Sequence, residues 1–142
     1  MKKVAKIFLT IAKIFDILAI VGYAIGAIGC VVGAVQATGA LEKAEAGSEA
    51  ATNAAVAFAS MISAAVTCAI CLILCIVGLI FAIKASKRLA TAKSKAEAKG
   101  MAIAAIVTGF LSTEFALVAG ILMLCMSDNM YAESTPIEVK AE

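Results

Sequence analysis

The stretch from Gly109 to Val118, GFLSTEFALV, places one carboxylate in the middle of an apolar run. The run extends from Met101 to Met126, and Glu114 is its only formally charged residue. It is longer than the roughly 20 residues that a helix needs to cross the hydrocarbon core of a bilayer. We therefore expect a membrane-spanning helix over residues 100–126, with Glu114 near the middle of the bilayer.

Two further runs have the same character. The run over 14–37 contains Asp16 as its only charge, and the run over 50–83 contains none. The 142-residue chain is 63% hydrophobic and 15% charged, whereas soluble domains are about 45–50% apolar and about 25% charged. Lipid offers the backbone no hydrogen-bond partners, so runs of this length cross a membrane as helices. The sequence predicts an all-α membrane protein with three transmembrane helices, over 14–37, 51–83 and 100–126.

The charges alternate between the connecting segments. Lysine and arginine gather in 1–13 and 84–99, whereas 38–50 and 127–142 are mostly acidic. Basic loops stay in the cytoplasm, so we expect the first two of these segments inside the plasma membrane. The loop over 38–50 and the tail over 127–142, which we expect to be disordered, would then lie outside. The basic segments are also expected to contact anionic lipid headgroups.

Residues 1–13 are predicted to form an amphipathic helical segment on the cytoplasmic membrane surface, because lysines and apolar residues fall on opposite helical faces. This segment would turn into the first crossing, with Lys13 and Asp16 paired at the boundary. A cleaved signal peptide that ends near the AVQA sequence is the alternative. Lys13 and Asp16 interrupt the apolar region that such a peptide needs, which favours the amphipathic segment.

Small residues form two ridges that predict close helix packing, because small side chains let helix backbones approach each other in lipid. The partner of each ridge can be a helix of this chain, a second copy or another membrane protein. The ridge on the first crossing consists of Gly22, Gly26, Gly29 and Gly33. The ridge on the third consists of Gly100, Ala104, Thr108, Ser112, Ala116 and Gly120.

Glu114 needs a partner from outside its own helix, because its neighbours at three and four positions are all apolar. An ionised residue at mid-membrane costs at least about 2.5–3.5 kcal/mol. Ser63, Thr67 and Tyr23 lie near the same expected depth, and we predict that Ser63 or Thr67 meets Glu114. A structural polar contact, ion or proton handling, and partner recognition all remain open as its role.

Catalytic and metal-binding patterns are lacking. The chain has no histidine, the commonest acid–base and metal-ligating residue. Cys68, Cys71 and Cys75 have a C-x2-C-x3-C spacing inside an apolar run, which is more typical of packing than of metal binding. A disulfide between Cys30 and Cys125 stays open. We expect no enzyme, no cofactor and no metal, and the basic loop lacks the aromatic residues of a nucleic-acid site.

One family resemblance emerges from residues 78–88, GLIFAIKASKR, and 98–111, AKGMAIAAIVTGFL. An apolar helix that ends in Lys/Arg, a short basic loop and a second helix with this opening resemble the helix pair of DUF4190-type small bacterial membrane proteins. The resemblance covers roughly residues 72–124. It implies a bacterial membrane location, and the family has no settled activity to carry over.

These patterns lead to two functional hypotheses. The first is a non-enzymatic interaction or accessory subunit that binds a membrane protein partner or a second copy through the small-residue ridges. The second is a self-associating pore or transporter that uses Glu114 as a protonatable group. The direction of Glu114 distinguishes them, because a pore would turn this side chain towards a water-filled centre.

Overall fold

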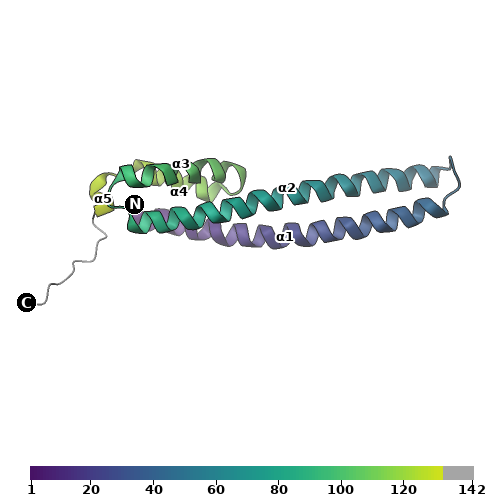
Figure 1. Cartoon of the computed structure of the whole chain (residues 1–142), viewed down its shortest axis with the longest axis horizontal. Coiled ribbons are helices and arrows are strands. Elements are labelled where there is room, and N and C mark those ends of the chain that lie inside the picture. The colour runs from purple at the N-terminus through teal and green to yellow at the C-terminus, as the bar shows by residue number, and fades with distance from the viewer. Residues whose placement is uncertain (133–142) are drawn as a thin grey trace, which may run out of the picture. The chain divides into compact units, whose positions relative to one another are not determined.

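The computed structural model describes residues 1–132, and helices account for nearly all of them (Figure 1). No strand occurs in this part of the chain, so the all-α prediction is confirmed. The helices are α1 (Lys2–Lys43), α2 (Glu49–Thr91), α3 (Lys95–Leu111), α4 (Glu114–Cys125) and α5 (Asp128–Ala132).

Two of these helices, α1 and α2, are long and apolar enough to cross a membrane. At a rise of 1.5 Å per residue each is roughly 63 Å long, about twice the thickness of a hydrocarbon core. α1 runs without a break from Lys2 to Lys43, so the predicted turn between a surface segment and the first crossing is wrong. Its first 20 residues contain neither glycine nor proline, which leaves nothing to interrupt the helix.

The predicted single helix over 100–126 is also wrong. α3 ends at Leu111 and α4 starts at Glu114, with Ser112 and Thr113 between them. Thr113 has an extended backbone (φ −137°, ψ 129°), which is the conformation of a residue that precedes a helix. Glu114 then lies in the first turn of α4, where a negative charge interacts favourably with the helix dipole.

α3 and α4 form a closely packed antiparallel hairpin. A Cβ atom added to Gly109 of α3 would meet the backbone of Leu117 and lie 2.8 Å from the carbonyl carbon of Ala116. A Cβ added to Gly120 of α4 would lie 2.6 Å from the carbonyl oxygen of Ala102. The two backbones therefore touch at both glycines, and no larger residue fits there without a shift.

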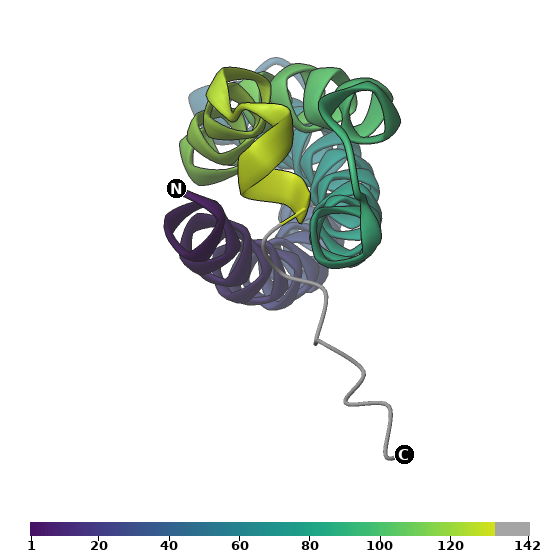
Figure 2. The ribbon, with the colours of Figure 1, turned by 90° about the vertical axis from the view of Figure 1, so that its left-hand side faces the viewer.

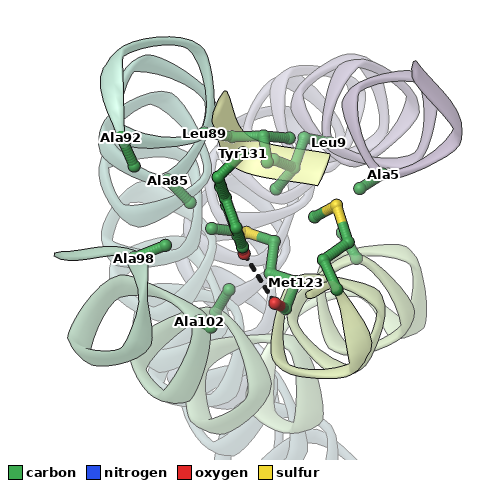
Figure 3. Packing of buried hydrophobic residues seen from close by; sticks show 12 residues of the cluster. Ala5, Leu9, Ala85, Leu89, Ala92, Ala98, Ala102, Met123 and Tyr131 are labelled. Carbon is green, nitrogen blue, oxygen red and sulfur yellow. Dashed lines mark hydrogen bonds between the residues drawn. The ribbon is translucent and has the colours of Figure 1, made fainter. Parts of the chain in front are cut away.

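The chain divides into two compact units, which are described separately. Unit 1 comprises residues 1–17 and 74–142, of which the structure describes residues up to Ala132, and unit 2 comprises residues 18–73. In unit 1 the start of α1, the end of α2, α3 and α4 pack around a common core, and α5 lies across one end of them (Figures 2 and 3). The core consists of Ala5, Leu9, Ala85, Leu89, Ala92, Ala98, Ala102, Ala105, Ala119, Met123, Met126 and Tyr131.

Unit 2 is a pair of helices formed by the remaining parts of α1 and α2. Their turn contains Gly47, the only residue with positive φ (81°) in the described chain. The Ser48 side chain caps α2, because its Oγ accepts a hydrogen bond from the Ala51 amide at 3.2 Å. Gly26 and Gly33 of α1 face α2, where added Cβ atoms would meet Cys68 at 3.5 Å and Met61 at 3.0 Å.

Candidate functional site at the hairpin turn

Asp16 is the one acidic residue that is fully buried in the described chain, with an exposed fraction of 0%. Neither of its carboxylate oxygens has a hydrogen-bond partner among the described residues. The predicted pair with Lys13 is wrong, since no such ion pair forms there. Buried polar groups in proteins are nearly always hydrogen-bonded, so this carboxyl group needs an explanation.

The α3–α4 turn comes close to Asp16 over a glycine of α2. A Cβ atom added to Gly78 would lie 2.5 Å from Ser112 Oγ and 3.5 Å from Asp16 Oδ2. The missing side chain at Gly78 therefore makes room for the Ser112 hydroxyl and the Asp16 carboxyl side by side on the surface of α2. Helices α1 and α2 and the α3–α4 turn of unit 1 meet at this point.

The hydroxyl groups of the turn differ in their hydrogen bonding. Ser112 Oγ donates to the carbonyl oxygen of Thr108 at 2.9 Å, and Thr108 Oγ1 donates to the carbonyl oxygen of Ala104 at 2.8 Å. Thr113 Oγ1 is buried and has no partner among the described residues. It does not cap α4, although Thr113 occupies the N-cap position. A second unsatisfied polar group thus lies next to Ser112 in the turn.

Aromatic rings attach the start of α4 to α1 beside this site. The Phe115 ring centroid lies 5.1 Å from that of Phe15 and 6.3 Å from that of Phe8. Phe15 directly precedes Asp16, and Phe115 follows the turn by two residues. Such ring pairs are worth about 0.5–1.5 kcal/mol beyond their buried area, so they help to keep the turn against α1.

Glu114 has a different place from the one expected from the sequence. It is the first residue of α4 and its side chain is exposed, so its assignment to the middle of a spanning helix is wrong. Ser63 and Thr67 are exposed residues of α2 in unit 2, and Tyr23 is half-buried on α1 in the same unit. The contact of Glu114 with Ser63 or Thr67 stays a prediction.

Each of the two predicted small-residue ridges is divided in the structure. Within unit 2, Gly26 and Gly33 face α2, whereas Gly22 and Gly29 have nothing within 4 Å of an added Cβ. The second ridge is divided between two helices. Ala104 and Thr108 belong to α3, whereas Ala116 and Gly120 belong to α4, and Ser112 lies in the turn.

The end of unit 1 has an additional buried polar residue that the sequence did not indicate. Tyr131 of α5 has an exposed fraction of 1%, and its hydroxyl donates to the carbonyl oxygen of Met123 at 2.6 Å (Figure 3). Lys2 Nζ donates to the Tyr131 carbonyl oxygen at 3.2 Å and lies 5.8 Å from the ring centroid. Disorder from residue 127 is therefore wrong up to Ala132, and 133–142 lie outside the described residues.

Burial changes the ionisation of both partners in this contact. It raises the pKa of the Tyr131 phenol above its ordinary value, and Asp128 adds a smaller increase. Burial lowers the pKa of the Lys2 ammonium group. Both shifts have the same physical origin, because removal from water disfavours the charged form of each group.

None of the five cysteines forms a disulfide in the described residues, so the bond between Cys30 and Cys125 is absent from this structure. No cluster of three or more histidine, cysteine, aspartate or glutamate side chains that could hold a metal ion occurs in residues 1–132.

Comparisons with protein-family models, curated proteins and solved structures gave no match to the chain. The resemblance to DUF4190-type proteins therefore stays a prediction.

Proposed function

We propose that this chain is a small multi-pass membrane protein that acts as a non-enzymatic interaction or accessory subunit. The observation that carries the proposal is the exposure of large apolar side chains along α1 and α2. Ile25, Ile28 and Val35 are each 66% exposed, and in the most apolar 18-residue window of α1 only 6% of residues are buried. Water-exposed apolar patches of this extent are rare in soluble monomers. We therefore expect lipid and other helices to bury these side chains.

Contacts within unit 1 favour a revised topology. Lys2 bonds to Tyr131, so the two ends of the described chain lie side by side. α4 has 12 residues and is only about 18 Å long, which is short of a hydrocarbon core of about 30 Å. We propose that α1 and α2 cross the membrane and that the α3–α4 hairpin returns to the side on which it starts. The topology proposed here has two crossings. It takes the place of the topology expected from the sequence, in which the chain crosses three times and its C-terminus lies outside.

The charges support an orientation for this arrangement. The basic residues of 1–13 and 84–99 all belong to unit 1, whereas the turn between α1 and α2 is flanked by Glu42, Glu45 and Glu49. The positive-inside rule then puts both ends of the described chain in the cytoplasm and the α1–α2 turn outside. The plasma membrane of a bacterium is the location that fits this reading.

The exposed part of the first glycine ridge supports a helical partner. Gly22 and Gly29 are seven residues apart, so they lie on one side of α1, and both are open. Small residues at such positions allow another helix to approach closely in lipid. A second copy of this chain and a different membrane protein both fit this surface.

Site-specific photo-crosslinking in intact membranes tests the proposal. A photoreactive amino acid at Val32, which is 51% exposed beside Gly29, should form a discrete protein adduct. Gly29→Leu should abolish this adduct, because the larger side chain prevents close approach. A matched substitution at an exposed position of α2, Ile70→Ala, should leave the adduct unchanged. Crosslinks to lipid alone, with or without Gly29→Leu, would contradict a role in protein interaction.

A further inference from the structure

We propose that Asp16, Ser112 and Thr113 form a proton-binding site, in which Asp16 carries a proton while the α3–α4 turn lies against Gly78 of α2. The proposal goes beyond an interaction role, and it does not depend on the identity of any partner. Its basis is the grouping of unsatisfied buried polar atoms at one turn. These atoms are both carboxylate oxygens of Asp16 and the hydroxyl oxygen of Thr113.

A count of donors and acceptors favours the protonated form. An ionised carboxylate only accepts hydrogen bonds. Among the side chains of the turn, the Thr113 hydroxyl is the one unpartnered donor, since Ser112 Oγ already donates to the Thr108 carbonyl at 2.9 Å. An ionised Asp16 would thus keep a charge with at most one bond from the side chains of the turn, and the structure gives it no bond at all among the described residues. A buried charge in that state is strongly disfavoured.

A proton on Asp16 removes the charge and supplies the missing donor. The carboxylic O–H can donate to Ser112 Oγ, which still has acceptor capacity, and the Thr113 hydroxyl can donate to the other carboxylic oxygen. The result is a continuous chain from Asp16 through Ser112 to the Thr108 carbonyl. Rotation of the side chains can make these bonds, because Ser112 Oγ and Asp16 Oδ2 both lie against Gly78, at 2.5 Å and 3.5 Å from a Cβ atom added there.

The surrounding helices offer no side chain that would neutralise an ionised Asp16. On α1 itself, Lys13 lies one turn earlier, half-buried and without an ion pair to Asp16. α2 contributes Gly78 and, one turn earlier, the buried thiol of Cys75. On α3, the Thr108 hydroxyl already donates to the Ala104 carbonyl oxygen, and the exposed Glu114 of α4 would only add a second negative charge.

The proton should therefore be coupled to the position of the turn. Loss of the proton leaves an unpaired charge beneath Ser112 and Thr113, so the turn has to move away from α2 and admit water. Return of the proton allows the turn to pack again. The site would release and take up its proton together with this movement.

Infrared spectroscopy of the full chain in lipid nanodiscs tests proton occupancy. Exposed carboxyl groups ionise near pH 4, so a carboxylic C=O band that persists above about pH 6 reports a buried acid. We expect such a band in the wild-type protein, its absence in Asp16→Asn, and its retention in the matched exposed control Glu114→Gln. Absence of the band from the wild type at all pH values above about 6 would overturn the proposal. Loss of the band on addition of Na⁺ but not of choline would also overturn the proposal, since a metal cation would then neutralise an ionised Asp16.

Cysteine labelling tests the coupled movement. In a chain whose five native cysteines are replaced, Thr113→Cys should react with a water-soluble maleimide several-fold faster once the infrared band is lost, after correction for the pH dependence of the thiol. Asp16→Asn should remove this acceleration, because the amide stays neutral at every pH, and Glu114→Gln should retain it. Equal corrected rates across the transition would contradict the coupling.

Discussion

The α3–α4 turn can pack against α2 only because residue 78 is a glycine and has no Cβ atom. We expect Gly78→Ala to lower the free energy of unfolding by about 1–3 kcal/mol, the usual cost of an overpacked contact. The new Cβ would lie 2.5 Å from Ser112 Oγ and 2.9 Å from Ser112 Cβ, so rotation of the hydroxyl alone cannot relieve the clash. Unfolding in mixed micelles, followed by circular dichroism, measures the change.

Gly100→Ala is the control for this substitution. Gly100 also belongs to a helix of unit 1, but nothing lies within 4 Å of an added Cβ. Alanine has the higher helix propensity, so this variant should be as stable as the wild type or up to about 1 kcal/mol more stable. A Gly78→Ala protein with the stability of Gly100→Ala would show that the turn does not pack against α2.

Tyr131 should make the stability of unit 1 depend on alkaline pH. Tyr131→Phe leaves the Met123 carbonyl without its bond and should cost about 1–3 kcal/mol at pH 7. Burial raises the pKa of the phenol above 10.0 in the folded state, so the neutral form is favoured there. Its contribution is complete below the unfolded value and is lost as the pH rises through the folded value.

The stability difference between the wild type and Tyr131→Phe, measured by denaturation at several pH values, should therefore be constant at neutral pH and shrink above about pH 10. The lysines titrate in both proteins, so they cancel in this difference. A difference that stays constant up to pH 11, or an equally stable phenylalanine variant at pH 7, would contradict the buried hydrogen bond.

At the scale of single elements, the α1 glycines separate into two faces. Gly33→Ile should destabilise unit 2 by about 1–3 kcal/mol, because its Cβ would already lie 3.0 Å from the Met61 sulfur. Gly29→Ile should change stability by at most about 0.5 kcal/mol, since its surroundings are open. Helix propensity changes equally in the two variants, so thermal unfolding of the pair isolates packing. Equal losses would mean that both glycines contact another helix.

Composition was sufficient to predict that the elements are helices, but not where the third apolar run breaks. Residues 101–126 have the length of a spanning helix, and hydropathy outweighed the weaker signal of Ser112, Thr113 and Glu114. A hydroxyl residue followed by an acid is a recognised helix start, and this signal could have located the hairpin. Asp16 was harder to assign, because its burial depends on Gly78 and Ser112, which are far from it in sequence.

At the scale of the whole molecule, the proposed topology is measurable by labelling with a membrane-impermeant thiol reagent. In a cysteine-free background, a cysteine at Ala46 should react in intact cells, whereas cysteines at Lys93 and Ser127 should react only after permeabilisation. The reason is that Lys2 bonds to Tyr131, so the last described helix stays on the side of the N-terminus. Reaction of the cysteine at position 127 in intact cells would contradict this topology and favour the three crossings expected from the sequence.

The contact between Lys2 and Tyr131 also has a consequence for biosynthesis. In the proposed topology only the turn between α1 and α2, residues 44–48, and the helix ends that flank it have to be carried across the bilayer. Translocation of charged groups is the costly part of membrane insertion, and the lysine-rich segments stay on the side of the ribosome. The two long helices can then enter the bilayer as one hairpin, and everything synthesised after Thr91 can assemble afterwards against helices already in place.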